Sequence, residues 1–196
     1  MKNIIMLRHG RKDGELIAAD QIKKIEENGI PAINYLVEGK PVILHYGSSF
    51  VRTKQTIQAF EHYANKEKLF QQTGFYIRSD SRFGNPGLFA DMIASPDVAA
   101  EAQKTTWYQA FMGYNPNFIT KVQEDMVAAL RKFFSLLEAG QVGITIGHTP
   151  MIEWLAFAID PKGAIPRNTK LDELTGFIFT EEDDGRISVQ AKVDPI

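Results

Sequence analysis

The sequence contains no cysteine. This excludes a scaffold held together by disulfides and any metal site built on thiolates. A large excess of one charge is also missing, because 22 lysines and arginines stand against 24 aspartates and glutamates. Broad nucleic-acid binding needs a clustered basic excess, so nucleic acid is not an expected partner.

Long apolar runs are missing as well. The apolar run within residues 1–8 is too short for a signal peptide, and no stretch reaches the roughly 20 apolar residues of a membrane helix. We therefore expect a cytoplasmic protein with no membrane partner. The sequence has no repeat, low-complexity tract or linker, so residues 1–196 are expected to fold as a single domain.

The sequence does show strand and helix patterns that alternate along the chain, which predicts an α/β fold. Continuous apolar runs such as 3–8 and 142–146 are typical of strands buried on both faces of a sheet. The last two strands flank Asp183-Asp184-Gly185, which predicts a hairpin turn. In chain order, strands are predicted at residues 3–8, 41–46, 75–77, 142–146, 176–180 and 187–191.

Helices are predicted between most of these strands. Apolar residues recur at helical spacing over 16–25, and Gly29 with Pro31 is expected to end this first helix. An apolar stripe over 119–137 predicts one long helix that ends at Gly140. Other helices are predicted at residues 51–66 and 150–159, with further helix starts at Ser95-Pro96 and Asn115-Pro116.

Three segments place a cationic or imidazole side chain where a predicted strand gives way to a helix. They are Arg8-His9-Gly10, the Ser48–Thr56 segment with Arg52 at its centre, and Gly147-His148-Thr149-Pro150. In open α/β sheets, ligands bind at the carboxyl ends of the strands. We therefore expect the three segments to form one pocket.

Leu7-Arg8-His9-Gly10 resembles the opening motif of the histidine phosphatase superfamily, in the branch that includes phosphoglycerate mutase-like enzymes. The Ser48–Thr56 segment is similar to the second motif of that family, and Gly147-His148 falls where the family carries its second histidine. The resemblance covers residues 4–158. It implies a three-layer α/β/α sandwich with a mostly parallel central sheet, in which residues 83–140 form a helical cap.

The resemblance assigns the nucleophile to His9, and a neutral imidazole can indeed attack phosphorus and form a phosphohistidine. The transferring phosphoryl group carries negative charge on its oxygens. Arg8 and Arg52 would grip those oxygens in pairs, and His148 would donate another hydrogen bond. Thr149-Pro150 is expected to begin a helix whose free amides face the anion. Because these groups cover the charge, neither a metal nor a cofactor is expected.

Around this centre, the residues expected to contact the substrate are Ser49, Thr149, Arg11 and Arg82. The proton donor has to come from elsewhere in the chain, because Asn85 occupies the position where many family members carry a glutamate. Asp80, Asp91 and Asp13 are the candidates, and Asp80 is preferred among them. A carboxyl group in this role must hold its proton near neutral pH, which requires a raised pKa.

Departures from the family pattern bear on the reaction. Lys12 and Glu15 stand where mutase-like members carry threonine and asparagine, which argues against a mutase. An enzyme without a strong acid should work best on leaving groups that depart easily. Phosphohistidine is one, since imidazole has a pKa near about 6.5, and an aryl phosphate is another. The leading hypothesis is a metal-independent phosphatase acting on a small phosphorylated metabolite or a phosphoprotein.

Two alternatives stay open, a phosphoglycerate mutase-like phosphotransferase and a phospho-ligand binding module with weak turnover. The two other histidines, His45 and His62, fall in no family motif and are expected to be structural. An aromatic cluster is expected to pack within the cap rather than to stack on bases. It consists of Trp107, Tyr108, Phe111, Tyr114 and Phe118. The sequence predicts no oligomeric state.

Overall fold

The computed structural model describes the chain except residues 68–71, 77–79, 85–89, 161 and 194–196. Its main sheet has six strands in the order β5-β4-β6-β1-β7-β8. Their bounds are β1 (Lys2–Arg8), β4 (Val42–His45), β5 (Gln72–Tyr76), β6 (Val142–Gly147), β7 (Gly176–Glu181) and β8 (Ile187–Val193). The pairings of β4 with β5 and of β6 with both β4 and β1 are parallel, whereas β7 is antiparallel to β1 and β8 to β7. The prediction of a mostly parallel sheet is confirmed.

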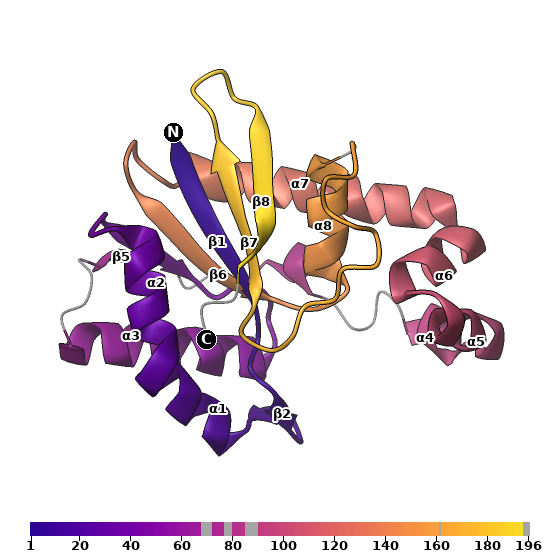
Figure 1. Cartoon of the computed structure of the whole chain (residues 1–196), viewed down its shortest axis with the longest axis horizontal. Helices are drawn as coiled ribbons and strands as arrows, with labels where there is room; N and C mark the ends of the chain where they lie inside the picture. Colours follow the sequence, from indigo (N-terminus) through magenta and orange to yellow (C-terminus); the bar gives the residue numbers. More distant parts are fainter. Residues whose placement is uncertain (68–71, 77–79, 85–89, 161, 194–196) are drawn as a thin grey trace.

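Helices cover both faces of the sheet (Figure 1). One layer contains α1 (Ala19–Lys24), α2 (Ile30–Val37) and α3 (Val51–Glu67), and the other contains α7 (Pro116–Ser135) and α8 (Met151–Ile159). Alternate side chains of β1 point to opposite layers, as the period of a strand requires. Ile4 and Met6 pack with α7 and α8, whereas Ile5 and Leu7 pack with the first layer. The chain is therefore a three-layer α/β/α sandwich, as predicted.

The range predicted as a cap, residues 83–140, contains two different parts. A group of short helices lies to one side of the sandwich in Figure 1. It consists of α4 (Ala90–Ala94), α5 (Pro96–Lys104) and α6 (Trp107–Tyr114). By contrast, α7 lies across the sheet, and its apolar stripe, from Ile119 to Phe134, is buried in the core. The predicted starts at Ser95-Pro96 and Asn115-Pro116 are both observed.

The first helix differs from its prediction. Leu16 belongs to the short strand β3 (Leu16–Ile17), which pairs with β2 (Lys12–Asp13). The chain then forms α1, a π-helical turn (Ile25–Gly29) and α2, so it does not stop at Gly29 and Pro31. Pro31 is the second residue of α2, which follows the π-helical turn without a break. The expected stop was wrong because a helix can continue past a proline through a local irregularity such as a π-helical turn.

The other element boundaries agree with the prediction within a few residues. The third strand covers Gln72–Tyr76, while Ile77 lies outside the described residues. The predicted turn at 183–185 joins β7 to β8. Within the described part of the chain, no helix is both long enough and apolar enough to cross a membrane.

Candidate active site at the ends of β1 and β6

The parallel pairing of β1 with β6 places two of the predicted segments side by side. Arg8 pairs with Gly147, and the amide of His9 then donates to the Gly147 carbonyl at 3.1 Å. As a result the rings of His9 and His148 lie 4.8 Å apart between centroids. They stand at the wall of a cavity of about 490 Å³. The cavity is lined by Arg8, His9, Arg11, Lys12, Phe50, Arg52, Gly84, Ile93, His148, Thr149, Pro150, Met151 and Glu173.

The second segment reaches this cavity through a tight turn at Gly47. Gly47 has a φ of +69°, and a Cβ there would lie 1.7 Å from the Ile146 carbonyl oxygen. Only glycine fits so close to β6 in this conformation. The turn is followed by Ser48, which is fully buried, and then by α3, whose first turn contains Arg52.

Hydrogen bonds set the tautomer of His9. Its Nδ1 lies 2.6 Å from the Gly10 carbonyl oxygen. A carbonyl only accepts, so Nδ1 carries the hydrogen and Nε2 carries the lone pair. Consistently, Arg52 Nε donates to His9 Nε2 at 3.1 Å. The nitrogen with the lone pair is therefore the one that points toward Arg52.

His148 is held in the opposite tautomer. Arg52 Nη2 donates to His148 Nδ1 at 3.4 Å, so the hydrogen of a neutral ring lies on Nε2. That nitrogen is 2.6 Å from Ser48 Oγ, which lies in turn 3.1 Å from Thr53 Oγ1. The Thr53 hydroxyl donates to the Phe50 carbonyl at 2.7 Å. This chain of hydroxyls fixes the ring from behind.

Arg52 connects the two histidines and stacks on a third ring. Its guanidinium carbon lies 4.3 Å from the centroid of the Phe50 ring, an arrangement that stabilises a cation. The Phe50 ring also meets His148 edge to face, with centroids 4.6 Å apart. Arg52 is thus held in one position by two imidazoles and a phenyl ring.

Both imidazoles are neutral near pH 7. Burial, then the charges of Arg52 and Arg8, lower the pKa of His9 to about 4, although the bond to Gly10 opposes the shift. Burial, then the neighbouring His9, Arg52 and Arg8, lower the pKa of His148 to about 2. A protonated ring would be desolvated and would face cations. The site therefore presents an unprotonated nitrogen beside positive charge.

Arg8 lines the cavity, but its guanidinium is bound to the loop before β7. Nη1 donates to the Leu171 carbonyl at 2.6 Å, and Nη2 pairs with Glu173 at 3.2 Å. Within the described residues, its buried Nε has no hydrogen-bond partner. Arg8 is thus oriented by residues far along the sequence.

A scan of the sequence against protein-family models gives no match, and neither does a search of curated proteins. The three-dimensional structure does have matches. Phosphoserine phosphatase from Entamoeba histolytica, solved with 3-phosphoglyceric acid, is similar with a TM-score of 0.61 at 10% identity, over 99% of this chain and 98% of that one. Bacillus stearothermophilus YhfR gives a TM-score of 0.61 at 16% identity, over 96% and 95%.

A third similar structure is the mycobacterial glucosyl-3-phosphoglycerate phosphatase solved with VO3. Its TM-score is 0.53 at 15% identity, over 97% of this chain and 98% of that one. The chain has the phosphoglycerate mutase-like α/β fold of these solved structures. Sequence identities this low establish the fold alone, so the site of this chain has to be judged on its own geometry.

The outer residues predicted to contact a substrate lie in different places. Thr149 lines the cavity, although α8 begins at Met151 with Pro150 as its N-cap, one residue later than the expected start at Pro150 with Thr149 as N-cap. Arg11 also lines it, exposed and paired with Asp20 at 2.6 Å. Ser49 is exposed and is not part of the wall, and its buried neighbour Ser48 contacts His148 instead. Arg82 is not part of the wall either.

Asp80 does not have the properties of a proton donor. Burial alone would raise the pKa of Asp80, but hydrogen bonds and charge from Arg82 outweigh burial and lower it. Its Oδ1 accepts from the Arg82 amide at 3.0 Å and from Arg82 Nε at 2.8 Å. A carboxylate held ionised by an arginine has no proton to give, so the structure weighs against this assignment. Asn85 lies outside the described residues.

Glu153 on α8 is a buried acidic residue that the sequence motifs did not indicate. Its side chain is 5% exposed, and burial raises its pKa to about 7. Oε1 accepts from the Leu171 amide at 3.2 Å, whereas Oε2 has no partner among the described residues. One signal could have pointed to it, because Glu153 is the only charged residue in the otherwise apolar segment Met151–Ile159.

His45 lies behind the site and has a structural role. His45 Nδ1 accepts from the Gly47 amide at 3.0 Å and lies 3.0 Å from Thr145 Oγ1, so it supports the turn behind the site. Across the described residues, no three histidine, aspartate or glutamate side chains come together as metal ligands.

Gly84 offers a direct test of the His148 position. A Cβ at Gly84 would lie 2.1 Å from His148 Cδ2 and 2.8 Å from Ser48 Cβ. We expect Gly84→Ala to displace the ring and to weaken binding of inorganic phosphate at least about tenfold, measured by calorimetry. Gly113→Ala is the matched control, since its new Cβ meets nothing within 4 Å. Unchanged phosphate affinity in a folded Gly84→Ala protein would contradict the geometry.

The protonation of His9 can be followed by NMR. We expect its ring signals, assigned with His9→Gln, to stay those of a neutral imidazole down to about pH 5, because its pKa is about 4. Arg52→Gln should raise that pKa, since the Arg52 charge lowers it. A midpoint near 6.5 in the unmodified protein would show that the ring is not held neutral.

Glu153 should make stability depend on pH. Its pKa of about 7, compared with 4.5 for a free glutamate, means that the folded state binds the proton more tightly. The stability that the bound proton of Glu153 contributes is then fully present below pH 4.5 and is lost as the pH rises through 7. As the pH rises from 4.5 to 8, the free energy of unfolding of the unmodified protein should therefore fall by about 3 kcal/mol relative to that of Glu153→Gln. Urea unfolding measures this, and parallel pH profiles for the two proteins would refute it.

Proposed function

We propose that the chain is a metal-independent phosphatase that hydrolyses a phosphomonoester or a phosphohistidine through a covalent phosphohistidine on His9. The observation that carries the proposal is the state of His9, whose Nδ1 is bound to Gly10 while its Nε2 lone pair faces the cationic cavity. The fold supports it, because solved structures of this fold include a phosphoserine phosphatase and a glucosyl-3-phosphoglycerate phosphatase. The substrate would be a small phosphorylated metabolite or a phosphoprotein.

The first step begins with a change of partner for Arg52. Arg52 donates to both imidazoles, but a phosphate dianion binds a guanidinium far more strongly than a neutral ring does. Once Arg52 turns to the phosphate oxygens, His9 Nε2 is free to form a bond to phosphorus. The bond to the leaving oxygen or nitrogen breaks, and the leaving group takes the electron pair. Gly10 still accepts from Nδ1 and stabilises the charge that develops on the ring.

The second step returns the enzyme to its starting state. Water attacks phosphorus, the bond from phosphorus to Nε2 breaks, and its electron pair returns to His9. The proton lost by water balances the one gained by the leaving group, so the net reaction is hydrolysis to inorganic phosphate. In both steps Arg52 and Arg8 would face the oxygens that carry the negative charge. His148 would donate to them only after a change of tautomer, because in the resting site its hydrogen lies on Nε2 beside Ser48.

The supply of a proton to the leaving group favours some substrates over others. Of the described residues that line this cavity, only Glu173 carries a carboxyl group, and it is paired with Arg8. A leaving group that departs without strong protonation is therefore favoured. Phosphohistidine and aryl phosphates meet this condition, whereas simple alkyl phosphates do not.

The proposal is tested with purified protein in excess chelator, on an aryl phosphate and on a phosphohistidine peptide. We expect turnover of both, with alkyl phosphates slower at least about tenfold. His9→Ala should lose at least about 10³-fold in kcat/KM, as expected when a nucleophile is removed. His62→Ala is the matched control, since His62 is exposed on α3 and away from the cavity. Protein denatured in alkali, which preserves the acid-labile bond from phosphorus to nitrogen, should carry phosphate on histidine only while His9 is present.

Each contrary result has its own meaning. Turnover that survives His9→Ala would overturn the mechanism, and turnover abolished by the chelator would overturn metal independence. Transfer of phosphate between phosphoglycerates in preference to water would establish a mutase instead. Tight phosphate binding without turnover of any substrate would establish a binding module.

A further inference from the structure

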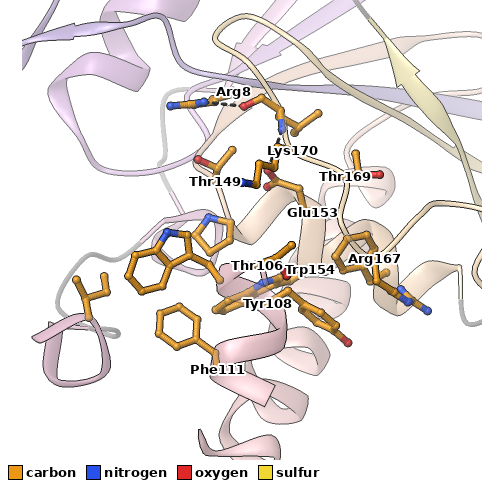
Figure 2. Close-up of a pocket in the computed structure, with 15 residues that line it drawn as sticks. Arg8, Thr106, Tyr108, Phe111, Thr149, Glu153, Trp154, Arg167, Thr169 and Lys170 are labelled. Atoms are coloured by element: carbon orange, nitrogen blue, oxygen red, sulfur yellow. Dashed lines mark hydrogen bonds between the residues drawn. The ribbon is translucent and has the colours of Figure 1, made fainter. Parts of the chain in front are cut away.

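A second cavity, of about 450 Å³, adjoins the one that holds His9 (Figure 2). The two cavities share four lining residues, Arg8, Ile93, Thr149 and Pro150. Its volume lies within the range of roughly 300–1,000 Å³ that is typical of small-molecule sites. A substrate whose phosphate lies beside His9 could therefore extend into this space without leaving the protein.

Five of the fifteen residues that line the second cavity are aromatic. Helix α6 contributes Trp107, Tyr108 and Phe111, and α8 contributes Trp154 and Phe157. The rings pack against each other edge to face, with Phe111 and Trp154 at 86° and Tyr108 and Phe157 at 70°. Trp107 is 39% exposed, and its ring centroid lies 5.3 Å from that of Phe111. Three members of the predicted aromatic cluster, Trp107, Tyr108 and Phe111, therefore pack with other rings and form one side of a cavity. Tyr114, by contrast, is exposed.

Buried polar groups distinguish this cavity from a packing defect. Glu153 lines it, lying between Arg8 and the aromatic rings in Figure 2. Its Oε2 is buried and has no partner among the described residues. An unpaired buried oxygen carries an energetic cost, which a hydrogen bond from a ligand would remove. Arg167 adds a cation on the same wall, 4.8 Å from the Phe157 centroid.

We propose that this cavity binds the non-phosphate part of the substrate, and that this part is a planar aromatic ring. The substrate class is then a small aryl phosphomonoester, whose phosphate lies beside His9 and whose ring lies among α6 and α8. Aromatic walls favour a ring over an alkyl chain, because edge-to-face contacts add about 0.5–1.5 kcal/mol beyond the burial of area. This inference rests on the proposed function, since it assigns the phosphate to the His9 cavity.

The cavity is large enough for a substituted ring. A dry cavity of about 150 Å³ holds one benzene, so 450 Å³ accommodates a ring with a small substituent and some water. A substituent that donates a hydrogen bond would meet Glu153 Oε2. The shared residues Thr149 and Pro150 lie where such a molecule would pass from one cavity to the other.

The two tryptophans make a direct experiment possible. The chain has only two, and both Trp107 and Trp154 line this cavity, so their fluorescence reports on it alone. The probes are benzylphosphonate and methylphosphonate, which cannot be hydrolysed. We expect only benzylphosphonate to change the tryptophan emission, and calorimetry to show that it binds at least about tenfold more tightly. Inorganic phosphate should displace both probes.

Two variants of α6 test whether the tighter binding of benzylphosphonate comes from contact between its ring and the aromatic wall. Trp107→Ala should weaken benzylphosphonate about tenfold, a loss of about 1.4 kcal/mol, and leave methylphosphonate unchanged. Tyr114→Ala is the matched control, since Tyr114 is 58% exposed on the same helix and does not line the cavity. It should change neither affinity.

The outcomes separate this inference from the proposed function. Binding of neither phosphonate, nor of inorganic phosphate, would contradict the phosphate site and so the function itself. Equal binding of the two phosphonates would overturn the aromatic site alone. Benzylphosphonate that phosphate cannot displace would also overturn it, because ring and phosphate would then bind apart. A phosphohistidine peptide that competes far better than benzylphosphonate would show that the occupant is a protein side chain.

Discussion

The candidate site depends on one backbone pairing, that of β1 with β6. The two strands end together, with Arg8 opposite Gly147, and the next residue of each chain segment is a histidine. Both strands are buried on both faces, so a shift of register by one residue would move their apolar side chains between the two layers. The packing that holds the sandwich together therefore also sets the spacing of the two imidazoles.

The arrangement of the site keeps water and unpaired carboxylates away from the two imidazoles. Both rings are buried beside cations. Glu173, the one carboxylate among the described residues of the cavity wall, is paired with Arg8. A histidine in such surroundings cannot easily take up a proton, so it keeps the lone pair that nucleophilic attack requires. The same condition costs stability in acid, because the unfolded chain binds protons that the folded rings reject. Reactivity at neutral pH and sensitivity to acid have the same cause.

Much of the fold and the central residues could be predicted from local sequence. Buried strands are recognised in the sequence as apolar runs. Where the strands are parallel, the histidine or arginine that follows each run lies with the others at the carboxyl ends of the strands. The orientation of Arg8 could not be predicted, since its Leu171 partner lies 163 residues away in sequence. The pairing of Asp80 with Arg82 is local, but the sequence does not show which side chain an aspartate will bind. The π-helical turn before α2 was also missed, because Pro31 alone looks like the end of a helix.

The hydrogen bond from Arg52 to His9 has a consequence for selectivity among reactive compounds. A buried, unprotonated imidazole is open to attack by any electrophile that reaches it, including neutral alkylating and acylating agents. Here its lone pair is already engaged by Arg52 Nε at 3.1 Å, and a neutral molecule offers the guanidinium no better partner. Only an anion with oxygens to bind can draw Arg52 away. The residue that recognises the charge of a ligand thus also guards the nucleophile against compounds that lack it.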